Sequence, residues 1–269
     1  GGSDGSSFRL NGTAFTYTRP ASNTTDGKND TITLQVTVTD GDGDTAEQSV
    51  TVNTVAGPLF NDAPSGGSSV VTTDEGNIPG MGSQHETSAT QPFGAATDGS
   101  FHMQLHGADA TVTIGGIELK VENGKLYHNG VEVTADAAVS VPDGTHGTLT
   151  VTGMDADGTV HYTYTLTTPV DATGNAANRP GEGDTGRGEA FDVTITTTGG
   201  TATGQITVDA LDDAPVLSTL DTTQTTVADS EAALTGTLSF TPGADAEGAR
   251  VTVEVEGQTF TGTKANGEW

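Results

Sequence analysis

Residues 31–52 read TITLQVTVTDGDGDTAEQSVTV, and this stretch indicates the class of fold. Apolar residues occupy alternate positions of 31–39 and of 49–52, and most positions between them carry threonine. A period of two is typical of a β-strand with one apolar face. The Gly- and Asp-rich residues 40–45 predict a turn between two antiparallel strands.

The same alternation returns along the chain, at residues 110–114, 148–152, 191–196 and 250–255. Turn residues recur at a spacing of roughly 8–12 residues, which is typical of antiparallel sandwiches. Hydrophobic residues make up only 32% of the chain, so disorder is the competing interpretation. The grouping of Val, Ile and Thr into alternating runs argues against it, and the sequence predicts an all-β protein.

Three sequence markers repeat in the same order and divide the chain into units. Phe-Thr-Tyr-Thr at 15–18 returns as Tyr-Thr-Tyr-Thr at 162–165, and Asn-Asp-Ala-Pro at 61–64 returns as Asp-Asp-Ala-Pro at 212–215. Gly-Ala-Asp-Ala at 107–110 returns at 243–246. We therefore predict the C-terminal part of a first β-sandwich repeat in 1–61, a complete repeat in 62–212 and the N-terminal part of a further repeat in 213–269.

Acidic side chains outnumber basic ones by 36 to 9, which gives a formal net charge of −27. A surface of this sign repels nucleic acid and anionic membranes, so we expect neither as a partner. No stretch reaches the roughly 20 apolar residues of a membrane helix. The chain has no cysteine, which excludes disulfides and thiolate metal sites and makes carboxylate-bound calcium (Ca²⁺) the expected crosslink.

The first candidate calcium site is the turn at 40–44, where Asp40, Asp42 and Asp44 alternate with glycine. Glycine allows the tight backbone that brings carboxylate oxygens together around a hard cation. An EF-hand is excluded, because its sixth and twelfth positions would be Thr45 and Thr51 instead of Gly and Glu. The alternative is a solvated hairpin turn without a cation.

The second candidate is the pair of linkers. Asp62 and Asp213 each lie just before an Ala-Pro, at joints where two domains can both supply oxygens. Crowded carboxylates repel each other unless a cation neutralises them; the alternative is a flexible acidic linker. We expect Asp209 and Asp212 beside Asp213 at the second joint, and Asp74 with Glu75 near the first. The full set of predicted calcium ligands is Asp40, Asp42, Asp44, Asp62, Asp74, Glu75, Asp209, Asp212 and Asp213.

Other motifs do not support catalysis. Residues 181–186 match the dinucleotide fingerprint in form, but they follow Pro180 and carry acidic residues that would repel a pyrophosphate. His102 and His106 are four residues apart on one face of a predicted strand, with no predictable third metal ligand, so we interpret them as ordinary histidines. No serine lies in a nucleophile elbow. We expect a protein that is not an enzyme.

Taken together, these residues resemble the tandem repeats of giant bacterial adhesins exported by type I secretion, the RTX adhesins. The resemblance rests on the strand followed by Asp-Gly-Asp-Gly-Asp-Thr at 40–45, the Asp-Ala-Pro linkers, Asp-Glu-Gly at 74–76 and Thr-Pro-Gly-Ala-Asp at 241–245. It implies immunoglobulin-like β-sandwiches in an extended array, stiffened by calcium at the joints. Residues 198–201 depart from the pattern, because Thr-Gly-Gly-Thr replaces the acidic turn there.

The function that follows is a structural extender of a secreted, calcium-dependent surface adhesin, involved in cell adhesion and biofilm formation. It would lie outside the cell, on the bacterial surface, with neighbouring repeats as partners and a host or biofilm receptor elsewhere in the parent protein. One rival is a subunit of an extracellular filament or sheath, joined head-to-tail by strand complementation. Another is a carbohydrate- or ice-binding module that presents threonine rows such as Thr31, Thr33, Thr37 and Thr39.

The two ends carry a further expectation. The start at 1–5, Gly-Gly-Ser-Asp-Gly, is typical neither of a signal peptide nor of natural initiation, so we expect an excerpt or a processed piece of a longer protein. Each end part alone would expose unpaired strand edges and apolar faces, at 32–38 and at 251–255. We expect the tail of one chain to complete the head of the next, in a longer periodic array or between identical subunits. The alternative is a segment cut without regard to domains.

Overall fold

The computed structural model describes residues 7–12, 14–18, 30–63, 65–82, 95–142, 144–170, 185–211, 213, 215–221, 236–244, 246–266 and 268. Within these ranges the regular structure is almost entirely β, and the one helical element is a 3-10 turn, η2 (Glu75–Asn77). None of the helical structure in this described part is long and apolar enough to cross a membrane. The prediction of an all-β protein is confirmed.

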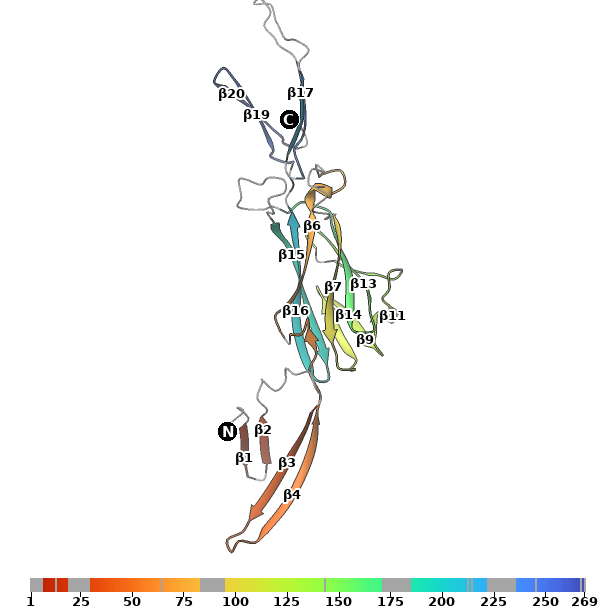
Figure 1. Cartoon of the computed structure of the whole chain (residues 1–269), viewed down its shortest axis with the longest axis vertical. Helices are drawn as coiled ribbons and strands as arrows, with labels where there is room; N and C mark the ends of the chain where they lie inside the picture. Colours follow the sequence, from red (N-terminus) through yellow and green to blue (C-terminus); the bar gives the residue numbers. More distant parts are fainter. Residues whose placement is uncertain are drawn as a thin grey trace, which may run out of the picture.

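Two sheets form the centre of the chain (Figure 1). The strands of the seven-stranded sheet are, in spatial order, β11 (Val131–Glu132), β10 (Lys125–His128), β9 (Ile117–Glu122), β8 (Ala110–Ile114), β15 (Thr185–Thr197), β16 (Gly200–Leu211) and β6 (Gly67–Asp74). Those of the five-stranded sheet are β12 (Val139–Val141), β13 (Gly147–Met154), β14 (Thr159–Leu166), β7 (Ala96–Gln104) and β5 (Leu59–Phe60). The sheets thus use residues 59–211, and β5 begins just before the boundary predicted at residue 62.

The strand order identifies the architecture. In the five-stranded sheet, β13-β14-β7-β5 reproduces the D-E-B-A order of an immunoglobulin domain. In the other sheet, β9-β8-β15-β16 reproduces the C′-C-F-G order. The ladders are antiparallel except that β6 pairs with β16 in parallel. The centre of the chain is therefore an immunoglobulin-like β-sandwich.

One apolar core lies between the two sheets, as the alternation predicts. Nine residues on the apolar faces of these alternating strands, which we predict from the sequence to form one core, all belong to a single buried cluster. They are Val112, Ile114, Leu149, Val151, Tyr164, Val193, Ile195, Ile206 and Val208. Phe60 of the short strand β5 joins them and stacks on Phe101, with 4.8 Å between ring centroids. A side chain at Gly204 would overlap the Phe60 ring, so this glycine makes room for it.

The N-terminal part forms two hairpins beside this sandwich. Strand β1 (Ser7–Asn11) pairs with β2 (Ala14–Thr18), and β3 (Asp30–Thr39) pairs with β4 (Thr45–Thr54). Each is a two-stranded sheet within the described residues. As predicted, apolar side chains on these strands are exposed, including Val36 and Val38.

The C-terminal part also contains two two-stranded sheets. Strand β17 (Val216–Asp221) pairs with β18 (Thr237–Thr241), and β19 (Arg250–Val255) pairs with β20 (Gln258–Thr263). Val253 and Val255 of β19 are exposed, again as predicted. Figure 1 shows that the β3–β4 hairpin, the sandwich and the C-terminal strands follow one another along the longest axis of the molecule. The two end parts therefore lie on opposite sides of the sandwich.

Candidate functional site

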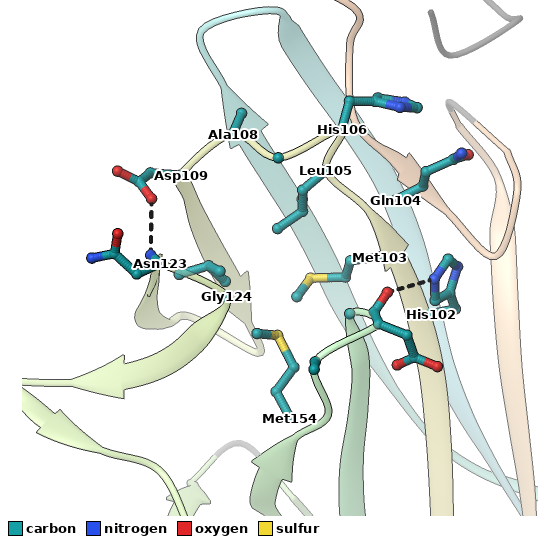
Figure 2. A pocket seen from close by; sticks show the side chains of 15 residues that line it. His102, Met103, Gln104, Leu105, His106, Ala108, Asp109, Asn123, Gly124 and Met154 are labelled. Carbon is teal, nitrogen blue, oxygen red and sulfur yellow. Dashed lines mark hydrogen bonds between the residues drawn. The ribbon is translucent and has the colours of Figure 1, made fainter.

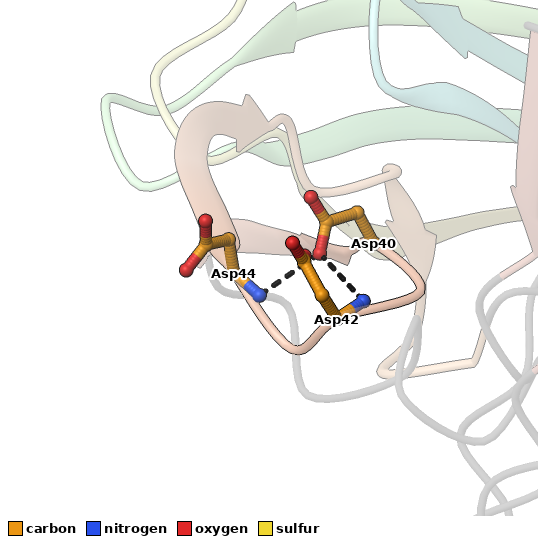
Figure 3. Close-up of side chains that lie close together, drawn as sticks. All are labelled: Asp40, Asp42 and Asp44. Atoms are coloured by element: carbon orange, nitrogen blue, oxygen red, sulfur yellow. Dashed lines mark hydrogen bonds between the residues drawn. The ribbon is translucent and has the colours of Figure 1, made fainter.

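The acidic turn at 40–44 brings its three carboxylates together at the tip of the β3–β4 hairpin. Ligand oxygens of Asp40, Asp42 and Asp44 all lie within 4.8 Å of one another (Figure 3). The loop closes locally, because Asp40 Oδ1 accepts hydrogen bonds from the backbone N–H groups of residues 42, 43 and 44, at 3.3, 3.1 and 2.9 Å. Gly43 has a φ of 101°, which a residue with a side chain rarely adopts. The predicted convergence of these carboxylates is confirmed.

Hydrogen bonding favours the ionised form of Asp40. The pKa of its carboxyl lies below the ordinary value, first because of the hydrogen bond with the Asp42 side chain and then because of the N–H of Asp44. All three carboxylates are exposed. Oxygen donors of this kind suit Ca²⁺, but the same hydrogen bonds also stabilise the turn without any ion.

The second set of carboxylates lies at the other end of the sandwich. Strand β6 runs parallel to β16, and Asp74 at its end is paired with Leu211 at the end of β16. The expectation that Asp74 and Glu75 approach the first joint, near Asp62, is therefore wrong. The eight-residue strand carries them about 23 Å away from that joint, at 3.3 Å per residue, to the joint that contains Asp213.

We call Asp74, Glu75, Gly76 and Asp213 the joint cluster. Its three carboxylate side chains are all buried. The Oδ1 atoms of Asp74 and Asp213 lie 3.0 and 3.2 Å from the point that a Cβ on Gly76 would occupy. The two carboxylates therefore converge on a residue that has no side chain to separate them.

Neutral donors hold these buried carboxylates. Asp74 is the N-cap of η2: its Oδ1 accepts from the Gly76 N–H at 2.8 Å, and its Oδ2 accepts from Asn77 Nδ2 at 3.1 Å. Glu75 Oε1 accepts from the Val170 N–H at 2.6 Å. Burial of a charge is unfavourable unless such partners or a counter-ion compensate it. Asp74 and Asp213, whose Oδ1 atoms both approach Gly76, are therefore two candidate oxygen ligands at this joint.

Asp213 connects the sandwich to the segment that follows. Its Oδ2 accepts from the backbone N–H of Ala244 at 3.0 Å. Ala244 is buried and belongs to the same apolar cluster as the sandwich core. Ala244 of the C-terminal part thus packs on the preceding unit, and a carboxylate of the linker accepts a hydrogen bond from its backbone.

Three predicted ligands remain besides the hairpin tip and the joint cluster, namely Asp62, Asp209 and Asp212. Asp62 is exposed in a tight turn, with a φ of 62°. Asp209 is half-buried and is paired in register with Thr72, two residues before the end of β16. Asp212 lies outside the described residues. Within the described ranges, only Asp40, Asp42 and Asp44 bring three candidate ligand atoms within 4.8 Å of one another.

Two features of the first joint were not found by sequence reasoning. Asn61 holds the joint with both ends of its amide: Oδ1 accepts from the His102 N–H at 2.8 Å, and Nδ2 donates to the Ser68 carbonyl at 2.8 Å. The Gly199 turn between β15 and β16 packs so closely on the Ala56 carbonyl that a side chain there would overlap it. The Thr-Gly-Gly-Thr sequence at 198–201, which departs from the repeat pattern, thus allows this close contact between two backbones at the first joint.

The histidines lie beside an open hollow of about 570 Å³, with Met103, Leu105 and Met154 among the residues that line it (Figure 2). The prediction that His102 and His106 share one face of a strand is wrong, because β7 ends at Gln104 and His106 has a φ of 53° in the following turn. His102 Nε2 lies 3.0 Å from the Asp157 carbonyl. In the described part of the chain, no group of three candidate metal ligands includes either histidine.

Threonines of β3 donate hydrogen bonds to polar side chains of β4 across the hairpin. Thr31 Oγ1 donates to Asn53 Oδ1 at 3.2 Å, and Thr37 Oγ1 donates to Glu47 Oε1 at 3.3 Å. Part of the hydroxyl array that a carbohydrate or ice would meet is thus engaged within the protein.

Comparison with known proteins adds little to this picture. No protein-family model and no curated protein sequence matches the chain. Among solved structures, the chain is similar to a chimeric tandem of titin domains that carries an exogenous peptide from fibronectin. That match has 12% sequence identity and a TM-score of 0.27, and it covers 76% of this chain and 74% of the titin chain. The class of protein that the strand order defines is an immunoglobulin-like β-sandwich with further β-hairpins on both sides.

Proposed function

We propose that the chain is an extender segment of a secreted bacterial surface adhesin, with a spacing and mechanical role and no catalytic activity. The observation that supports the proposal best is the joint cluster. A buried carboxylate, Asp213, holds the backbone of the following segment at Ala244, and a second buried carboxylate, Asp74, lies beside it. The geometry of the joint therefore depends on how its negative charge is balanced.

Calcium is the cofactor that we propose for this role. The residues that would hold it are Asp74, Glu75 and Asp213 at the joint, and Asp40, Asp42 and Asp44 at the hairpin tip. Bound there, Ca²⁺ would supply positive charge that offsets the repulsion between carboxylates, of which the chain has 36 against 9 basic side chains. Oxygen-only ligands and a flexible coordination number make calcium a better match than magnesium.

Linkage explains how the joint would act as a stiffening device. A cation that binds the ordered joint and not the disordered one stabilises the ordered form by mass action, by about 2.7 kcal/mol when its concentration is 100 times Kd. Successive units would then hold a fixed orientation with calcium and a variable one without it. A chain of such units would keep an adhesive tip away from the cell surface.

Thermal unfolding of the full chain tests the proposal. We expect the melting temperature to rise with calcium above its value in a chelator, and to rise less with magnesium at equal ionic strength, because part of any response is charge screening. Small-angle scattering should show a longer maximum dimension with calcium. Asp213→Asn should reduce the calcium response, whereas Asp192→Asn, at an exposed position on β15, should leave it unchanged. Equal responses to calcium and magnesium would remove the case for specific sites.

A further inference from the structure

The exposed apolar faces of the two end parts have buried counterparts in the central sandwich. The β3–β4 hairpin aligns with β15–β16 when the cross-strand pair Gln35–Ser49 is matched to Asp192–Gln205, because apolar residues then occupy the same positions of both hairpins. Four apolar positions of β3 and β4 are 43% to 63% exposed, while the matching positions of β15 and β16 are at most 1% exposed. The pairs are Val36 with Val193, Val38 with Ile195, Val50 with Ile206 and Val52 with Val208.

The β19–β20 hairpin aligns in the same way with β8–β9. Both hairpins turn over two residues with positive φ: Gly115 and Gly116 at 50° and 83°, and Glu256 and Gly257 at 49° and 79°. Three apolar positions of β19 and β20 are 48% to 57% exposed, and their counterparts are at most 1% exposed. The pairs are Val253 with Val112, Val255 with Ile114 and Phe260 with Leu119.

The central sandwich shows what normally covers such strands. There, β8 and β15 lie side by side and antiparallel, with Ile114 opposite Val193 and Val112 opposite Ile195. In the end parts, β3 pairs only with β4, and β19 only with β20, among the described strands. Within the described residues, each end hairpin thus presents a strand edge without a neighbour, next to apolar residues, of the kind that another strand extends.

The groove beside β3 is open as well. Phe8, Phe15, Leu34, Val36 and Val38 line a hollow of about 500 Å³ between the β1–β2 and β3–β4 hairpins. Phe15 is 47% exposed, whereas Tyr162, its counterpart in the repeated Phe-Thr-Tyr-Thr marker, is buried. Among its described residues, the N-terminal part therefore leaves uncovered the apolar faces that the central sandwich buries.

We propose that the β19–β20 hairpin of one chain pairs with the β3–β4 hairpin of a second copy of this chain. The two form one sheet in the order β4-β3-β19-β20, as β16-β15-β8-β9 do in the central sandwich. Strands β3 and β19 run antiparallel, with Val36 opposite Val255, Thr37 opposite Glu254 and Val38 opposite Val253. The occupant is a second copy because the two hairpins of one chain lie on opposite sides of its sandwich (Figure 1).

Repetition of this heterologous contact joins copies head-to-tail, into a ring or an open filament according to the rotation between successive copies. Each copy carries a formal charge of −27, so mutual repulsion opposes association and salt weakens that repulsion. The contact itself uses apolar residues and backbone groups and needs no metal. It can therefore be examined in a chelator, where failure of the calcium proposal does not affect the result.

Disulfide trapping tests the proposed register, since the natural chain has no cysteine. Full-length Thr37→Cys and Glu254→Cys variants are mixed in chelator at physiological salt and oxidised. We expect a mixed disulfide between the two chains, identified by mass spectrometry of the linked peptides. The matched control is Thr33→Cys mixed with Glu254→Cys, because residue 33 is on the same face of β3 but about 14 Å farther along the strand, beyond the reach of a disulfide.

Sedimentation of the unmodified protein provides an independent measurement. We expect the average mass to rise above 27.1 kDa with increasing protein concentration. Val38→Lys should abolish that rise, and Thr39→Lys, at the next position and on the opposite face, should not. Both residues are exposed in the single chain, so neither change should alter its circular dichroism. A constant mass of one chain at all concentrations, or equal crosslinking of the test and control pairs, overturns the proposal.

Discussion

Asp74→Asn is the substitution that most directly examines the joint cluster. The variant keeps the shape of the side chain and an Oδ1 acceptor for the Gly76 N–H, but it removes one negative charge. Its Nδ2 replaces the oxygen that accepts from Asn77 Nδ2 at 3.1 Å. The experiment therefore sets the loss of one hydrogen bond against the relief of repulsion from Asp213.

Two magnitudes decide the sign. The lost hydrogen bond costs about 1.5–3 kcal/mol, because its acceptor is a buried, charged carboxylate. The Oδ1 atoms of Asp74 and Asp213 lie 3.0 and 3.2 Å from a common point, so they are no more than about 6 Å apart. At an effective dielectric constant of about 20, their repulsion is about 3 kcal/mol. Without a cation the relief of repulsion equals or exceeds this loss, and we expect Asp74→Asn to stabilise the protein by up to about 1.5 kcal/mol.

In calcium we expect the opposite sign, so that Asp74→Asn destabilises the protein. A cation at the joint would neutralise the repulsion in the unmodified protein, so Asp74→Asn would then lose both a hydrogen bond and an ion ligand. The assay is urea unfolding followed by far-ultraviolet circular dichroism, in chelator and in saturating calcium, with Asp192→Asn as the exposed control. A variant that is less stable in both conditions would refute the reasoning about repulsion. A variant that is more stable in both would refute a cation at the joint.

Other predictions concern the packing around these sites. Gly76→Ala should lower the melting temperature, because its Cβ would press on both Asp74 and Asp213, whereas Gly41→Ala has open space and should not. Phe60→Ala should lower the free energy of unfolding in urea by about 3–5 kcal/mol, since the ring is fully buried on Phe101. Burial raises the pKa of the Tyr162 hydroxyl, so the folded chain keeps a proton that the unfolded chain loses near pH 10. The contribution of Tyr162 to stability should therefore be fully present below about pH 10 and be lost above it, and Tyr162→Phe should remove this part of the alkaline loss of stability in unfolding titrations.

Short-range features of this protein could be predicted from its sequence because they depend on neighbours in the chain. Alternation along 191–196 and 110–114 places Val193 and Val112 on the apolar faces of their strands, and both residues belong to the buried core. The acidic turn at 40–44 brings its carboxylates together because Asp40 closes this short loop with hydrogen bonds from the backbone N–H groups of residues 42, 43 and 44. The exposed valines of β3 and β19 follow from the repeat pattern alone.

Long-range placement could not be predicted in the same way. The sequence puts Asp74 thirteen positions from the first linker residue Asn61, and proximity in the chain suggested proximity in space. Only the parallel pairing of β6 with β16 carries Asp74 to the end of the sandwich where Leu211 and Asp213 lie. The repeated Asp-Ala-Pro linkers make different contacts at the two joints. Asp213 accepts a hydrogen bond from Ala244, whereas Asp62 is exposed.

The sequence by itself determined that this chain is all-β, which residues face the core and where acidic turns occur, because period-two alternation and turn chemistry act over a few residues. The tertiary structure alone decided which carboxylates meet. A strand has two ends, and whether its last residue joins one linker or the other depends on the strand beside it, here a partner more than 130 residues further along the chain. The packing of two sheets around one core fixes this strand pairing. The pairing brings Asp74 and Glu75 to the end of the sandwich where Asp213 lies.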